Sequence, residues 1–227
     1  MSGSDKSAGL AGIVAGRTAV STVHAESGDL RYRGYSIADL CEETSFEEVA
    51  YLLLRGELPR RQELDEFRSR LAAARILPDP LMTLLEELPA ATHPMDVLRT
   101  GCSALGCLEP ERSFADQQHV AERLLGALPS MLLHWLECHN RGARRTVAGD
   151  AATMAGDFLS RLYGKPVPES RALDVSLILY AEHEFNASTF TARVVASTLS
   201  DSTRASRRRS ARFAGLCTAA PMSRRSS

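Results

Sequence analysis

The sequence predicts an all-α fold with a short β-hairpin at its N-terminal end. Three observations lead to this prediction. Apolar residues recur at helical spacing through most of residues 45–201, and serine and proline residues stand where helices would begin. Residues 8–35 differ, because they mix glycine with β-branched and aromatic residues, and Ser27-Gly28-Asp29 supplies a hairpin turn.

Each predicted helix carries its own signals. Ser45 and Glu48 form a capping box ahead of a helix over 46–55, which Gly56 ends. Pro129 lies inside the longest periodic segment and predicts a kink or a break there. Amphipathic spacing predicts the remaining helices at 62–74, 78–88, 95–105, 115–139, 150–163, 170–182 and from 188 onward.

Charge is distributed unevenly along the 227 residues. Segment 202–227 holds seven arginines and no acid, which leaves 20 basic and 28 acidic residues in the rest of the chain. This segment has no apolar stripe, so it could not offset the entropy of its own ordering. We therefore expect a folded body at 8–201, with a disordered N-terminus at 1–7 and a disordered Arg-rich tail at 202–227.

Composition bounds the class of protein. The five cysteines are an odd number with no CxxC pair, which favours buried thiols in a reducing compartment over disulfides or a zinc site. The N-terminus lacks the apolar core of a signal peptide, and no apolar run reaches the roughly 18 residues of a membrane span. We expect a soluble, cytoplasmic protein with no membrane partner, no bound metal and no resident cofactor.

His183 is the strongest candidate functional residue. It stands between Glu182 and Glu184, with a predicted helix on either side. One interpretation is a core histidine whose imidazole is satisfied by a neighbouring carboxylate, and the other is a histidine in a binding site. By contrast, His134 and His139 are five residues apart, which does not match the i, i+4 pairing of a helical metal site, so they are interpreted as structural.

The stretch Tyr180-Ala-Glu-His-Glu-Phe-Asn-Ala-Ser-Thr-Phe190 resembles the oxaloacetate-site motif of citrate synthases, in the form typical of bacterial 2-methylcitrate synthases. The motifs Tyr32-Arg-Gly-Tyr35, Gly56-Glu-Leu-Pro59 and Leu88-Pro-Ala-Ala-Thr-His-Pro-Met-Asp-Val-Leu-Arg-Thr-Gly101 resemble the same family. The resemblance runs from about Gly9 to Asp201. It implies the N-terminal part of the large all-α domain of a citrate synthase, with the small domain missing.

The resemblance also implies an activity. Members of this family condense an acyl-CoA with oxaloacetate. The resemblance therefore implies acetyl-CoA or propionyl-CoA as the acyl donor and citrate or 2-methylcitrate as the product. It also implies a homodimer. His183 resembles an oxaloacetate-binding histidine, and Arg61 is a weaker candidate substrate contact by its position in the same pattern. No catalytic residue is expected to be retained. The enol-stabilising histidine and the aspartate base would follow Asp201.

The resemblance implies that a glycine-rich Gly-Pro-x-His-Gly-Gly-Ala-Asn block with the enol-stabilising histidine should follow Asp201. The printed sequence lacks this block, but a shifted reading frame of the tail contains it. With third bases chosen among allowed codons, a frame starting two bases into codon 202 yields Cys-Gly-Pro-Leu-His-Gly-Gly-Ala-Asn in register, with its histidine where Thr218 stands. We therefore predict a single-base deletion at codon 202 and an inactive truncated chain. The alternative is a non-catalytic dimerisation or interaction fragment whose basic arm binds nucleic acid or acidic lipid, although nucleic acid is the less favoured partner.

Overall fold

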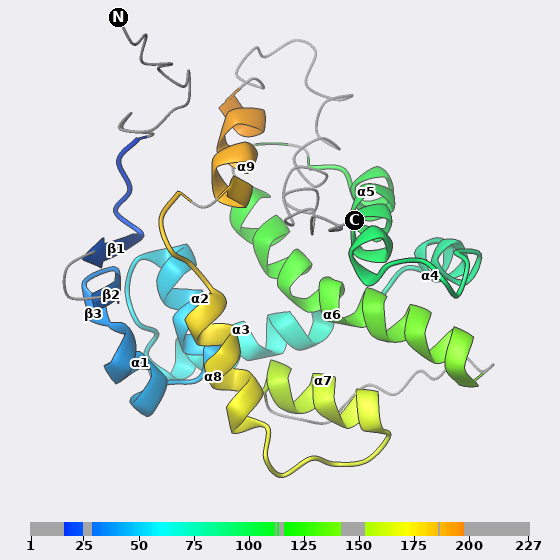
Figure 1. The fold of residues 1–227 in the computed structure, drawn as a ribbon, viewed down its shortest axis with the longest axis horizontal. Coiled ribbons are helices and arrows are strands. Elements are labelled where there is room, and N and C mark those ends of the chain that lie inside the picture. The colour runs from blue at the N-terminus through cyan, green and yellow to red at the C-terminus, as the bar shows by residue number, and fades with distance from the viewer. Residues whose placement is uncertain are drawn as a thin grey trace, which may run out of the picture.

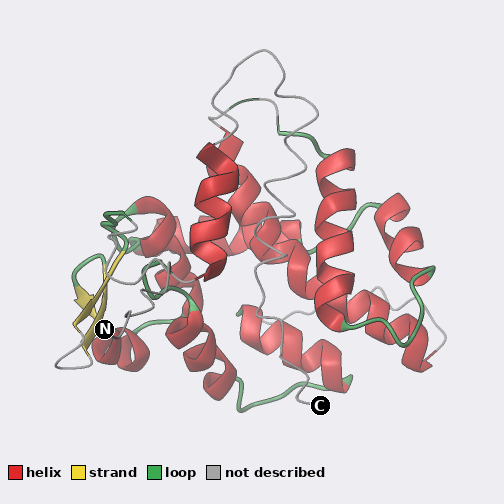
Figure 2. Ribbon diagram, turned by 45° about the horizontal axis from the view of Figure 1, so that its top comes forward, coloured by secondary structure: helices red, strands yellow, loops and turns green. Residues whose placement is uncertain are grey.

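Helices make up most of the structure, and a small antiparallel sheet lies at its N-terminal side (Figure 1; Figure 2). The structure is a computed structural model that describes residues 16–24, 29–111, 113, 116–141, 153–185 and 187–197. The N-terminus 1–7, most of the hairpin turn and the tail 202–227 lie outside these residues, so the predictions made for them remain predictions.

The element order confirms the all-α prediction with its N-terminal hairpin. The strands are β1 (Ser21–His24), β2 (Asp29–Tyr32) and β3 (Tyr35–Ser36), and the helices are α1 (Ile37–Glu43), α2 (Phe46–Arg55), α3 (Arg61–Ala74), α4 (Asp79–Glu86), α5 (Pro94–Leu108), α6 (Gln117–Arg141), α7 (Met154–Tyr163), α8 (Arg171–Tyr180) and α9 (Ala187–Ser197).

Two elements were not predicted, and both are short. Strand β3 has two residues and pairs with β2 across a tight turn at Arg33 and Gly34, which both have positive φ. Helix α1 has seven residues and begins at Ser36, whose side chain accepts a hydrogen bond from the Ala38 N–H. Neither element is long enough to show a periodic pattern.

The helix boundaries follow the local signals closely. Helix α2 has the predicted bounds: Glu48 accepts a hydrogen bond from the Ser45 N–H at 2.8 Å, and Gly56 ends the helix in the left-handed region at φ 99°. Helix α6 continues through Pro129, so the predicted break does not occur. Helix α8 ends at Tyr180, two residues before the predicted end, and this releases Glu182 from the helix.

The core consists of two main apolar clusters on either side of α6, which packs against α3, α4, α5 and α7. One cluster joins β2, α1, α2, α3, α7 and α8, with Tyr32, Leu52, Phe67 and Ile178 among its buried members. The other joins α4 and α5 to α6 through Leu81, Leu85, Val97, Met131 and Trp135, among others.

Glycine permits the close crossing of α3 and α6. A Cβ on Gly126 would lie 2.6 Å from the Cβ of Ala74 and 2.7 Å from the carbonyl oxygen of Leu71. Both distances are far below normal contact, and one of the two partners is backbone. The crossing therefore depends on the absence of a side chain at Gly126.

We predict that Gly126→Ala destabilises the protein even though alanine favours helix by about 1 kcal/mol. Overpacking costs about 1–3 kcal/mol and usually more than offsets such a gain, so the melting temperature should fall. Gly101→Ala is the matched control. Its Cβ would meet the flexible Met131 side chain first, and its melting temperature should fall less. Equal melting temperatures for the two variants would contradict this reading.

Glu122 links three helices through ion pairs between its buried carboxylate and two exposed arginines. Its carboxylate, 4% exposed, accepts from Arg55 at 2.6 Å and from Arg70 at 2.7 Å, which joins α6 to α2 and α3. Burial by itself raises the pKa of Glu122, but hydrogen bonds from Arg70 and Arg55, with their charges, hold the pKa below its usual range. The folded protein therefore favours the ionised carboxylate.

We predict that Glu122→Gln lowers the free energy of unfolding by about 1–2 kcal/mol, because Arg55 and Arg70 lose a charged hydrogen-bond acceptor while water still screens their exposed guanidinium groups. Since the folded pKa is depressed, this contribution is complete above about pH 4.3, the unfolded value, and is lost as the pH falls through the folded value. Urea unfolding of wild type at pH 7 and pH 3 should show this loss, and E122Q should show less of it. Glu66→Gln, at an exposed position on α3, should behave as wild type does.

Candidate functional site

His183 lies in the short segment that joins α8 to α9. Its side chain is exposed, and no described residue forms a hydrogen bond to its imidazole. The interpretation of His183 as a buried core histidine is therefore wrong. The ring is available to a ligand, and the structure of the segment depends on how the backbone around the ring is held.

Tyr32 anchors this segment from the sheet. Its ring is fully buried in the core, and its hydroxyl donates to the Ile178 carbonyl at 3.0 Å and accepts from the Glu182 N–H at 3.2 Å. Burial, the largest influence, raises the pKa of Tyr32, so the hydroxyl keeps the proton that it donates. One buried group thus ties the end of α8 and the residue before His183 to β2.

Glu184 anchors the other side of His183. Its N–H donates to the buried Ser21 Oγ at 2.9 Å, and its carboxylate accepts from the Val23 N–H at 2.9 Å, so both ends of the residue bind β1. Its φ of 69° lies in the left-handed region, which costs a non-glycine residue about 1–3 kcal/mol. Two hydrogen bonds to the strand hold this strained backbone in place.

The carboxylates of Glu182 and Glu184 were expected to hold the imidazole of His183, but they have a different role. Glu182 accepts a hydrogen bond from the His183 N–H at 2.9 Å, and Glu184 binds the strand. Neither carboxylate holds the imidazole. Both acids fix the backbone on either side of His183, and the ring extends from a braced segment.

Arg193 is a cation that the sequence analysis did not single out. It lies on α9, with its guanidinium carbon 4.9 Å from the centre of the Phe185 ring. Phe185 also contacts the N-terminal segment, because a Cβ on Gly16 would come 3.0 Å from its ring. This contact places a positive charge beside the segment that carries His183.

Arg61 lies elsewhere. It is the first residue of α3, it is exposed, and it forms a surface ion pair with Asp65 at 3.1 Å. Among the described residues no interaction connects it with the His183 segment, so the structure does not bring the two predicted substrate contacts together. The role of Arg61 as a substrate contact stays a prediction.

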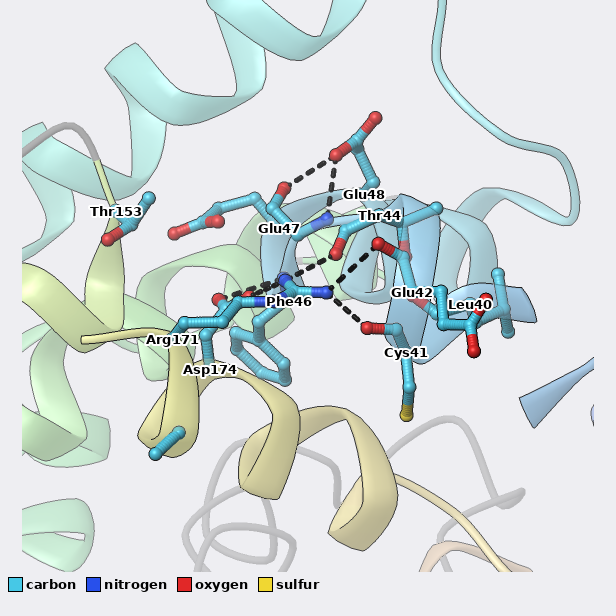
Figure 3. A network of polar contacts seen from close by, with 12 residues as sticks. Leu40, Cys41, Glu42, Thr44, Phe46, Glu47, Glu48, Thr153, Arg171 and Asp174 are labelled. Carbon is cyan, nitrogen blue, oxygen red and sulfur yellow. Dashed lines mark hydrogen bonds and ion pairs between the residues drawn. The ribbon is translucent and has the colours of Figure 1, made fainter. Parts of the chain in front are cut away.

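Helix α8, which carries the site segment at one end, is fixed at its other end by Arg171 (Figure 3). The guanidinium donates to the carbonyls of Thr44 at 2.7 Å and of Cys41, at the end of α1, and forms an ion pair with Asp174 at 2.6 Å. Arg171 thereby joins α8 to the C-terminal end of α1, where carbonyls lack helical partners.

Buried carboxylates complete this anchorage. Asp174 on α8 accepts from the Phe46 N–H at 3.1 Å, and Glu47 on α2 accepts from the Met154 N–H at 2.5 Å. Each carboxylate therefore satisfies the first residue of another helix, where free N–H groups and the helix dipole favour negative charge. Burial, the largest influence, raises the pKa of Glu47, although its hydrogen bond from Met154 opposes this.

Metal-type donors do not gather at the His183 segment in the part of the chain that the structure describes. Among the described residues, the one group of metal-type donors comprises Glu86, His134 and Cys138, and it lies between α4 and α6. The four described cysteines are free thiols, but only Cys102 is buried and Cys107 is exposed, so the prediction of buried thiols is wrong for most of them. No helix in the described ranges is both long and apolar enough to cross a bilayer.

The comparisons with known proteins identify the family. A family model described as "Citrate synthase, C-terminal domain" matches residues 9–207, and the chain belongs to the citrate synthase family. It is 52% identical over 196 residues to the 2-methylcitrate synthase of Shewanella oneidensis, covering 86% of this chain and 52% of that protein. It is 45% identical over 204 residues to 2-methylcitrate synthase 2 of Corynebacterium glutamicum, covering 85% and 53%.

Solved structures give the same result for the fold. The citrate synthase of Thermotoga maritima matches with a TM-score of 0.77 and 29% identity over 93% of this chain and 55% of that one. The citrate synthase of Thermoplasma acidophilum, in a ternary complex with carboxymethyl coenzyme A and oxaloacetate, matches with a TM-score of 0.78 and 26% identity over 90% and 54%. These matches confirm the predicted citrate synthase fold. The chain spans about half the length of the curated relatives it matches.

We predict that Tyr32→Phe loosens the His183 segment. The change leaves the Glu182 N–H without its partner, which costs about 1–3 kcal/mol, while the Ile178 carbonyl keeps its bond from the Ala181 N–H. Hydrogen exchange of peptides covering 181–185 should be faster, and the free energy of unfolding should fall by that amount. Tyr35→Phe is the control, because Tyr35 is 44% exposed on the neighbouring strand. If both variants exchange at the wild-type rate, Tyr32 does not anchor the segment.

Proposed function

We propose that this chain forms the oxaloacetate side of an enzyme that condenses an acyl-CoA with oxaloacetate, and that His183 contacts the keto acid. The observation that carries the proposal is the exposed imidazole on a segment braced by Tyr32 and Glu184. Family membership supports it, as does the related citrate synthase whose structure holds carboxymethyl coenzyme A and oxaloacetate.

The chemistry of the segment suits a keto acid. An imidazole N–H can donate to a carbonyl or carboxylate oxygen, and such a donor, fixed beforehand, polarises a carbonyl without reorganisation during the reaction. The backbone on both sides of His183 is held by hydrogen bonds of 2.9–3.2 Å. Arg193, held beside Phe185, offers a positive charge to a substrate that carries two carboxylates.

Propionyl-CoA is the acyl donor that we propose, with 2-methylcitrate as the product. The relatives named 2-methylcitrate synthase range from 41% to 52% identity to this chain, and the one from Shewanella oneidensis, at 52%, exceeds the 43% of the citrate synthase of Mycolicibacterium smegmatis. We place the reaction in the cytoplasm and expect a homodimer, as the sequence resemblance implies.

The 227-residue chain is proposed to bind without catalysing. Its matches cover about half of each relative, and the enol-stabilising histidine and the aspartate base are expected in the half that it does not match. The family match ends at residue 207, close to the predicted break after Asp201. Proton transfer and positioning each contribute orders of magnitude to rate, so their loss should abolish turnover.

The test uses this chain and a longer product in which codon 202 is restored to the citrate-synthase frame. Thiol release from propionyl-CoA plus oxaloacetate should be seen only with the longer product. In that product His183→Asn should lower kcat/KM for oxaloacetate by about 100-fold or more. His119→Asn, on the exposed face of α6, is the control and should leave kcat/KM unchanged.

Two outcomes would overturn the proposal. Normal turnover by the 227-residue chain would show that no further residues are required. Unchanged kinetics for H183N would remove His183 from the site. If the chain instead binds DNA or anionic vesicles with a steep salt dependence, the alternative of an interaction fragment with a basic arm is supported.

A further inference from the structure

A second group of reactive side chains lies away from the His183 segment, between α4 and α6. Glu86 is the last residue of α4, and His134 and Cys138 are one turn apart on α6. His134 Nε2 is 2.9 Å from Glu86 Oε1 and 3.8 Å from Cys138 Sγ. The three donor atoms all lie within 4.8 Å of one another.

These three donors are the types that zinc takes. Thiolate, imidazole nitrogen and carboxylate oxygen bind Zn²⁺ at about 2.0–2.3 Å, so tetrahedral ligands stand about 3.3–3.6 Å apart. The nitrogen–sulfur separation of 3.8 Å is already close to that value, and the nitrogen–oxygen separation needs to open by a few tenths of an ångström. A Zn²⁺ ion with one thiolate and one carboxylate is also neutral overall, which lowers the cost of burial.

The arrangement is more than a satisfied buried histidine. A hydrogen bond to Glu86 would account for His134, which is 5% exposed. The i, i+4 spacing on α6 adds the Cys138 sulfur as a third donor, 3.8 Å from the same ring nitrogen. Glu86 and Cys138 are only partly buried, so the donors can be reached from solvent.

The geometry points to a zinc site in which Glu86, His134 and Cys138 bind one Zn²⁺ ion, with water as the fourth ligand. Binding replaces the proton on the Cys138 sulfur by the metal and releases that proton to solvent, with no change of oxidation state. The ion would join the end of α4 to α6 and would stabilise their packing. The site differs from the His183 segment and does not depend on the proposed activity.

The sequence-based prediction that His134 is structural misses this site, because the spacing that matters joins His134 to Cys138 and not to His139. The residue one helical turn after His134 is Cys138, and an i, i+4 pair places both side chains on one face. The third donor is 48 residues away in the chain and comes close only through the packing of α4 on α6.

The test is metal binding by the full 227-residue chain under a phosphine reductant. Co²⁺ should give a thiolate-to-metal charge-transfer band, and Zn²⁺ should displace it at one ion per chain. Zn²⁺ at about 100 times its dissociation constant should raise the melting temperature by about 5–10 °C. Cys138→Ser should remove the charge-transfer band, and Glu86→Gln should weaken Zn²⁺ binding by more than the roughly 10–100-fold expected for residues behind the ligands.

Cys107→Ser is the matched control, since Cys107 is an exposed thiol on α5, and its variant should bind Zn²⁺ as wild type does. Circular dichroism of each metal-free variant checks that it folds, and Cys138→Ser is nearly isosteric, so folding should survive. The inference is overturned if wild type binds no Zn²⁺ at micromolar concentration. It is equally overturned if C138S and E86Q bind as tightly as wild type.

Discussion

The hydroxyl of Tyr32 is the interaction on which the arrangement around His183 depends. A phenol buried in an apolar core must find hydrogen-bond partners, because an unsatisfied polar group there costs about 1–3 kcal/mol. The partners of Tyr32 are the last turn of α8 and the N–H of Glu182. The hydrogen-bonding requirement of this buried hydroxyl thus fixes where α8 ends and where the segment bearing His183 begins.

Buried carboxylates support the rest of the helical framework in the same way. Asp174 and Glu47 each accept a hydrogen bond from the N-terminus of a helix other than their own. Glu122 on α6 forms ion pairs with one arginine on α2 and one on α3. Removing one partner leaves a buried charge or N–H alone, which is costly. The framework is therefore specified by charge as well as by apolar packing. Glu182 and Glu184 also act structurally, although they are only partly buried.

Local signals in the sequence were sufficient for most of the fold. The capping box at Ser45, the stop at Gly56 and the amphipathic spacing give the helices, because each reflects contacts within a few residues. Elements too short for a period, such as α1, were missed. The site was half predicted. His183 was found from its motif, but the partners of Glu184 were not, because Ser21 and Val23 lie more than 150 residues earlier in the chain.

The crossing at Gly126 has a mechanical consequence. Ala74 and the backbone of Leu71 approach the glycine with no side chain between them, so α3 and α6 have no slack along which to slide. The two helices must move together as one lever that spans both apolar clusters. Any rearrangement around His183 must then leave the crossing of α3 and α6 intact.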